Sequence, residues 1–176
     1  MNLILTAPTW LIVVLVLALL AAALQDAIRF KISNLTCGIV LLTAIVAMVL
    51  QGFSMSLWQN LSVCIAILVL GTAAFAGGWL GGGDVKLLAV LGLWFDLRSA
   101  VALLAAVFIA GGLVAFLYIA ARWARLRKQS LDKGGGRVPY GIAIAAGALF
   151  MFGVQFQQRP TNSVVEQIRA IEAQQR

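Results

Sequence analysis

The 176-residue chain is 62% hydrophobic, carries charge on only 11% of its residues and has a mean hydropathy of +1.01. This composition excludes a soluble globular domain. The formal net charge of +7 does not indicate a nucleic-acid partner, because the cytoplasmic loops of membrane proteins collect Lys and Arg. We therefore expect the lipid bilayer as a partner and no nucleic acid.

Apolar runs of roughly 15–25 residues follow one another, the length that a helix needs to cross the hydrocarbon layer. Transmembrane β-barrels alternate apolar and polar residues, and these runs do not. We predict an all-α, polytopic membrane domain over residues 1–154 and a polar extracytoplasmic tail over 155–176, with a short interfacial helix. Six transmembrane helices are predicted, over Thr9–Leu24, Leu35–Leu50, Leu61–Phe75, Val85–Phe95, Ser99–Ala121 and Val138–Val154.

The basic residues indicate the orientation of these helices. Segments 25–34, 76–86 and 122–137 hold most of the Lys and Arg, whereas connections 51–59 and 96–98 hold only Arg98. By the positive-inside rule, the first three segments are cytoplasmic. This orientation predicts an N-terminus outside the cell and a tail on the same outer side.

The fourth predicted span, Val85–Phe95, is too short to cross a bilayer upright, since eleven residues at ~1.5 Å each give about 16 Å. Its start would lie below the membrane surface. Irregular backbone at that depth is tolerated where it lines a water-filled cavity or is buried in protein. We therefore expect the glycine-rich segment 76–84 to line a wet cavity that opens to the cytoplasm.

Two aspartates stand at the edges of apolar segments. Asp26 follows the first apolar run, in a polar segment predicted over Gln25–Asn34, and Asp84 ends the cluster Gly81-Gly82-Gly83-Asp84. Ionisable groups near hydrocarbon are costly and are usually functional. Taken alone, Asp26 can mark a helix end and Asp84 can be the N-cap of the next helix. Both, however, are predicted on the cytoplasmic side.

Two neighbouring carboxyl groups can share one proton, so that one activates a water while the other polarises a carbonyl. This is aspartyl protease chemistry, and it needs neither metal nor cofactor. The chain has no histidine, which excludes a Ser–His–Asp triad and an HExxH zinc site. Cys37 and Cys64 lack zinc-ligand spacing and are expected to be free thiols. We predict an intramembrane aspartyl protease with catalytic Asp26 and Asp84.

Three motifs resemble those of type IV prepilin peptidases. Residues 81–86, Gly-Gly-Gly-Asp-Val-Lys, match the GxGDxK pattern, so Gly81, Gly83 and Lys86 are candidate supporting residues. Asp26 and the later Ile32-Ser33-Asn34 resemble the first-aspartate motif D-x-x-x-x-x-I-P-N. Asn34 is therefore another candidate supporting residue. Residues 138–141, Val-Pro-Tyr-Gly, resemble the last-helix motif of the short members. Ser33 replaces the usual proline, so the bend after Asp26 is expected to differ.

The resemblance implies a GxGD-type membrane protease fold in a bacterial cytoplasmic (inner) membrane. The implied substrates are prepilin or pseudopilin precursors, whose basic leader would be removed at the cytoplasmic face. The four-cysteine insertion of the longer, bifunctional members is missing. The chain therefore looks like the peptidase-only form of the Tad/Flp pilus type, without N-methyltransferase activity.

Other interpretations of the same residues remain open. Asp26 and Asp84 could bind an ion or relay a proton in a small transporter or channel, with the glycine segment as its broken helix. A scaffold of a secretion machine would tolerate substitution of both aspartates. Lys86 either reaches for the membrane interface or biases the local charge and contacts a substrate carboxylate.

Overall fold

The computed structural model describes residues 2–52, 57–126, 140–158 and 172. Apolar runs form its main helices, as a chain in lipid must satisfy its own backbone. In chain order the helices are α1 (Leu3–Thr6), α2 (Thr9–Arg29), α3 (Asn34–Gln51), α4 (Leu57–Ala76), α5 (Gly82–Gly92), α6 (Leu97–Leu126) and α7 (Tyr140–Gln157).

Among the described residues, five helices are long and apolar enough to cross a membrane, namely α2, α3, α4, α6 and α7. This confirms a polytopic helical membrane protein. α5 has only 11 residues, so the predicted count of six transmembrane helices is not confirmed. The short α1 at the N-terminus was not expected. The tail beyond residue 158 lies outside the described residues apart from residue 172, and so does most of the basic loop 122–137.

The prediction that the first long helix ends at Leu24 was wrong, because the helix continues to Arg29. It ends because Phe30 adopts a left-handed conformation, with φ of 50° and its N–H bonded to the Asp26 carbonyl at 2.9 Å. The prediction of a polar segment from Gln25 was therefore wrong. Asp26 lies near the C-terminal end of a helix, and the helical geometry fixes the direction of its side chain.

The start of α6 lies at the far end of α5, where a short turn joins the two helices. Asp96 precedes α6, and its Oδ1 accepts a hydrogen bond from the Ser99 N–H at 3.0 Å, an N-cap interaction. Partial burial works against ionisation, but hydrogen bonds from Ser99 hold the pKa of Asp96 below its usual range. Asp96 is thus a structural carboxylate, remote from the other two aspartates.

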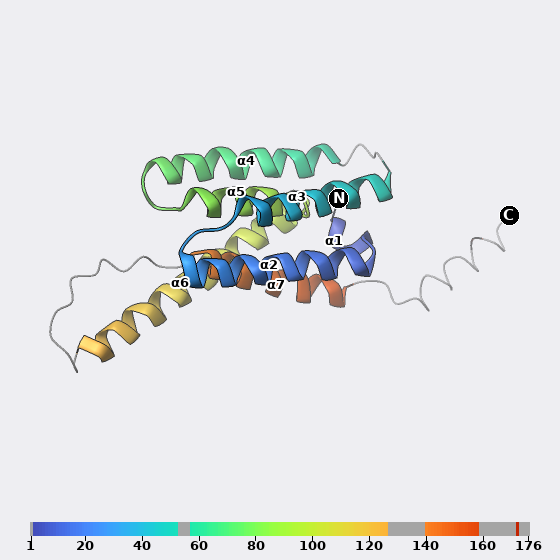
Figure 1. Cartoon of the computed structure of the whole chain (residues 1–176). Coiled ribbons are helices and arrows are strands. Elements are labelled where there is room, and N and C mark those ends of the chain that lie inside the picture. Colours follow the sequence, from blue (N-terminus) through green and yellow to red (C-terminus); the bar gives the residue numbers. More distant parts are fainter. Residues whose placement is uncertain (1, 53–56, 127–139, 159–171, 173–176) are drawn as a thin grey trace.

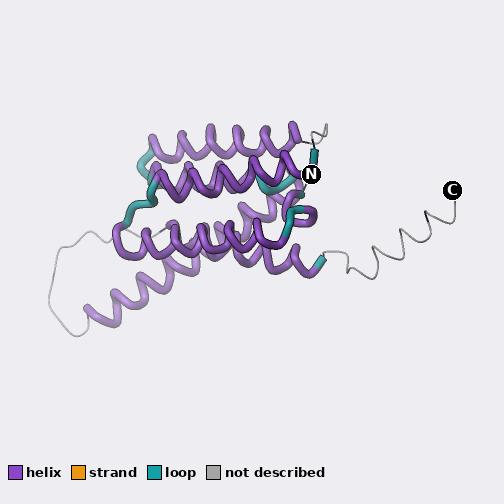
Figure 2. The backbone as a smooth tube through the Cα atoms, turned by 45° about the vertical axis from the view of Figure 1, so that its right-hand side comes forward, coloured by secondary structure: helices purple, strands orange, loops and turns teal. Residues whose placement is uncertain are grey.

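The helices form two layers (Figure 1). α3, α4 and α5 lie in one layer, with α5 packed against α3 and α4. α2 and α7 pack side by side in the other, and α2 also contacts α3. α6 crosses the bundle obliquely, packs mainly on α7 and touches α4 at few points. Its C-terminal half projects beyond the other helices in both views (Figures 1 and 2).

The short α5 lies at the centre of the packing. Leu87 and Leu91 of this helix, and Trp94 and Phe95 just after it, are fully buried. Phe95 stacks on Phe152 of α7, with ring centroids 5.8 Å apart. Such burial of apolar side chains holds α5 inside the bundle although it is too short to span a membrane itself.

Three helix ends meet at one end of the bundle, at the left of Figure 1: the C-terminus of α2 and the N-termini of α5 and α7. The basic residues Arg29, Lys31 and Lys86 belong to this end, whereas Asp96 and Arg98 belong to the other. Asp26 and Asp84 therefore lie on the same side, as the sequence predicted. The assignment of that side to the cytoplasm stays a prediction.

The crossing of α6 and α7 depends on Gly147. A Cβ at Gly147 would come within 2.8 Å of the Val107 backbone N and Cα. We expect Gly147→Val to separate the two helices and to lower the free energy of unfolding by about 1–3 kcal/mol, the usual cost of overpacking. Thermal unfolding in detergent measures this loss.

The control is Gly153→Val, also on α7, because a Cβ there meets nothing within 4 Å. Its stability should stay close to that of the wild type. Equal loss in both variants would mean that valine is harmful in α7 for another reason than contact with α6.

Candidate functional site

Asp26 is a buried carboxylate, with 4% of its surface exposed. Its Oδ2 accepts a hydrogen bond of 2.6 Å from the N–H of Gly141, in the first turn of α7. The first backbone N–H groups of a helix have no partner within it, so they are free to hold a carboxylate. A Cβ at Gly141 would lie 2.8 Å from this oxygen, so only glycine leaves room for the contact.

Asp84 is also buried, with 9% exposed. Asp84 is not the N-cap of α5, because the helix begins earlier and Asp84 lies within its first turn. The N-cap is Gly81, whose N–H donates to the Asp84 Oδ2 at 3.2 Å. A Cβ at Gly81 would lie 2.7 Å from that oxygen. The hydrogen bond therefore fixes the carboxylate against the backbone of the glycine cluster.

The two carboxyl groups come from helices that are distant in sequence, and they lie where the C-terminus of α2 meets the N-termini of α5 and α7. Each is held by a backbone N–H from a different glycine, Gly141 for Asp26 and Gly81 for Asp84. The tertiary structure thus brings both predicted catalytic candidates to one buried place at the same end of the bundle.

The two aspartate motifs also touch directly. A Cβ at Gly83 would lie 3.2 Å from the Cβ of Ile32 and 3.4 Å from its backbone N and O. This close approach presses the first turn of α5 against the connection between α2 and α3. Nearby, the Nζ of Lys86 donates to the Oδ1 of Asn34 at 3.2 Å. The candidate supporting residues Gly81, Gly83, Lys86 and Asn34 therefore all lie around the two aspartates.

The connection after Asp26 contains Ser33 at the position where a proline was expected. Ser33 has φ of −70°, close to the value of about −65° that proline imposes. Its N–H donates to the Oε1 of Gln25 at 3.0 Å, and its hydroxyl accepts from the Leu35 N–H as the N-cap of α3. Serine thus takes a proline-like φ here and adds hydrogen bonds that proline could not make.

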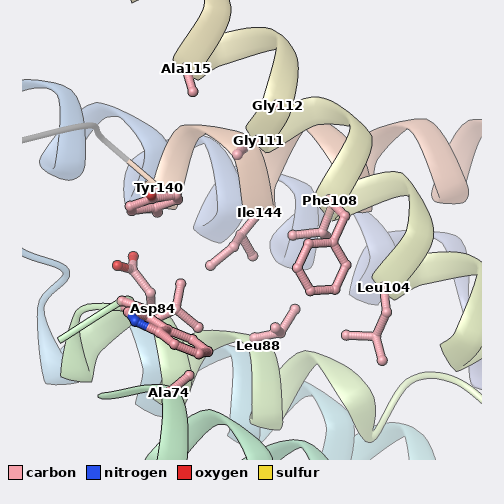
Figure 3. A pocket seen from close by; sticks show the side chains of 14 residues that line it. Ala74, Asp84, Leu88, Leu104, Phe108, Gly111, Gly112, Ala115, Tyr140 and Ile144 are labelled. Carbon is pink, nitrogen blue, oxygen red and sulfur yellow. The ribbon is translucent and has the colours of Figure 1, made fainter. Parts of the chain in front are cut away.

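A pocket of about 590 Å³ adjoins Asp84. It lies between α4, α5, α6 and α7, and its lining is apolar apart from a few groups at one end. Figure 3 shows the carboxylate of Asp84 pointing toward Tyr140 at that end, with Leu104 at the opposite end. A buried carboxylate at the end of an apolar pocket is a common arrangement for a binding or catalytic site.

Sequence reasoning missed two features of this site. The N–H of Gly141 holds Asp26, and Tyr140 lines the pocket beside Asp84. Both belong to the Val-Pro-Tyr-Gly motif over residues 138–141, which in the sequence indicates only a resemblance to the family. The available signal was a glycine at the start of an apolar helix. A contact over 115 positions of the chain cannot be read from local pattern.

Cys37 and Cys64 are free thiols, as expected. Among the described residues, no three His, Cys, Asp or Glu side chains form a group that could hold a metal ion. The sequence model of the type IV leader peptidase family matches residues 13–116, which run from α2 into α6 and include both aspartates. The chain belongs to this family. No curated protein and no solved structure matches it.

Membership makes this chain a peptidase-family protein of the membrane. The match ends before α7, so Gly141 lies outside it. The structure connects Gly141 to the matched region, because its N–H holds an aspartate that lies inside that region. The two aspartates, their glycine donors and the apolar pocket together form the candidate active site.

The prediction of a wet cavity beside the glycine cluster can be tested at Gly82. A Cβ there would make ordinary contact with Phe75 at 3.4 Å, so Gly82→Cys should fold. In a background with Cys37 and Cys64 replaced by alanine, we expect this thiol to react with a membrane-impermeant reagent added from the cytoplasmic side. Lys31→Cys should react in the same way, and Ile109→Cys, on a membrane-spanning helix, should not. Full protection of the thiol at position 82 would contradict a wet cavity.

Proposed function

We propose that this protein is an intramembrane aspartyl endopeptidase that removes the basic leader from type IV, Flp-type prepilins at the cytoplasmic face of the membrane. The observation that carries the proposal is a pair of buried carboxyl groups, both within the region that matches a leader peptidase family, held at one end of a membrane bundle. We do not expect N-methyltransferase activity, since the chain holds two cysteines and lacks the four-cysteine insertion of bifunctional relatives.

Asp26 and Asp84 are the proposed catalytic pair. One ionised carboxylate takes a proton from a water molecule, whose oxygen attacks the scissile carbonyl carbon. The other carboxyl, protonated, donates to the carbonyl oxygen as negative charge develops there. The tetrahedral intermediate then collapses, the C–N bond breaks, and the amide nitrogen leaves with a proton from the pair. Gly141 and Gly81 direct the two carboxyl groups by their backbone hydrogen bonds.

The distribution of charge supports a cytoplasmic active site. Arg29, Lys31 and Lys86 lie at the end of the bundle that carries the aspartates. A substrate with a basic leader and an apolar helix obeys the same positive-inside rule, so its leader stays in the cytoplasm. Enzyme and scissile bond would then meet at the same membrane surface. This orientation implies an N-terminus outside and a bacterial cytoplasmic membrane location.

Family membership favours a peptidase over the transporter or channel that the aspartates alone would also allow. The roles of Lys86 and Asn34 follow from their hydrogen bond. This bond ties the start of α3 to α5 and so keeps the two aspartate motifs together. We propose both as positioning residues.

Loss of either catalytic carboxyl should abolish cleavage. Asp26→Asn and Asp84→Asn each keep the size of the side chain but cannot act as a base or share a proton. We expect leader removal from a co-expressed prepilin to fall by about 100- to 10,000-fold, the usual contribution of general acid–base catalysis. Gel mobility of the precursor and mature pilin measures it.

Asp96→Asn is the matched control, because Asn caps helices about as well as Asp and Asp96 lies at the other end of the bundle. This variant should process the prepilin normally. Complete leader removal by both Asp26→Asn and Asp84→Asn would overturn the proposed function.

The Gly141 contact should affect turnover. In Gly141→Ala the new methyl group displaces the Asp26 carboxylate, since it would lie 2.8 Å from Oδ2. We expect kcat to fall by about 10- to 100-fold with little change in KM, because small misplacements of a catalytic group are costly. The control Gly153→Ala adds the same methyl group to α7 in open space. A normal kcat in Gly141→Ala would mean that this hydrogen bond does not position Asp26.

A further inference from the structure

The pocket beside Asp84 extends well beyond the two carboxyl groups. From the end that holds Asp84 and Tyr140 it runs past Ile144 and Phe108 to Leu104 (Figure 3). α4, α6 and α7, which supply most of its walls, are all long enough to cross a membrane. The pocket is therefore an apolar extension of the candidate active site into the depth of the membrane.

The sides of this pocket are incompletely closed. α6 packs mainly on α7 and makes few contacts with α4, although both helices line the pocket. Two large side chains of the lining are mostly exposed: Trp79 is 77% exposed and Phe108 is 78% exposed. An opening between α4 and α6 would face lipid, so a molecule that enters there must itself be apolar.

The lining leaves room for a bulky occupant. Part of the α6 wall consists of the small residues Gly111, Gly112 and Ala115, and a Cβ added at Gly112 would meet nothing within 4 Å. One turn of a helix, about 5.4 Å long and 10–12 Å across, fills roughly 420–610 Å³. The pocket volume of about 590 Å³ therefore matches one helical turn with its side chains.

We infer that this groove seats the first turn of the substrate's apolar helix, the segment directly after the scissile bond. The inference rests on the proposed function, because Asp84 at the end of the groove then meets the bond that precedes this turn. Among the described residues that line the groove, Asp84 is the only acidic one and none is Lys or Arg. The basic leader stays outside, where the helix ends meet, and the groove selects the apolar part of the substrate.

Gly112→Leu tests this inference by filling the groove. The probes are a precursor with a basic leader, a glycine and a full apolar helix, and a soluble peptide that ends one residue after the same bond and so lacks the helical turn. For the long precursor we expect KM to rise at least about tenfold, because a leucine occupies the space of the incoming turn. The KM of the short peptide, which lacks this turn, should rise much less.

Gly153→Leu is the matched control: it is also a helical glycine with open space around it, but it does not line the groove. It should leave both substrates unaffected. If the wild type cleaves the long precursor and Gly112→Leu has the same KM, docking in this groove is wrong while the proposed function stands. If the wild type cleaves neither substrate, the proposed function is wrong.

A binding measurement tests substrate docking in the groove independently of cleavage. A photo-crosslinking amino acid at Phe108, in Asp84→Asn, should capture the long precursor through the first turn of its apolar helix. The same group at Phe150, an exposed side chain of α7 outside the groove, is the control. Equal capture at both positions, or capture through the leader, would overturn the inference.

Discussion

A carboxylate buried among membrane helices needs a hydrogen-bond donor, and the N–H of Gly141 meets this need for Asp26. The contact joins the end of α2 to the start of α7 and requires glycine, because a Cβ would collide with the carboxylate. α2 continues to Arg29, so Asp26 lies within the helix and is buried in the bundle.

The second aspartate depends on a helix that is too short to cross a membrane. α5 keeps its place because its apolar residues are buried by α3, α4 and α7. Its first turn then lies within the protein, where the Gly81 N–H can hold Asp84. Gly83 lets this turn pack on Ile32, in the segment that follows Asp26. Small residues thus bring two costly carboxyl groups together in a place that lipid alone would not tolerate.

The same arrangement leaves space beside α5. α6 starts at the far end of α5, crosses the bundle obliquely and rests mainly on α7. The wall that it contributes to the pocket includes small residues at Gly111, Gly112 and Ala115. In the peptidase that we propose, the groove would hold the apolar part of a substrate, and the acids would act on the bond at its end.

The sequence by itself determined the membrane class, the number of long helices to within one and the two candidate aspartates. These follow from composition, from the length of apolar runs and from the rarity of acids near them, which are all local properties. It did not determine the end of α2, because Phe30 in a left-handed conformation gives no clear signal. Nor did it reveal the bond from Gly141 to Asp26 or the groove beside Asp84. Those depend on how distant helices pack, and only the tertiary structure decides which small residues face which carboxylates.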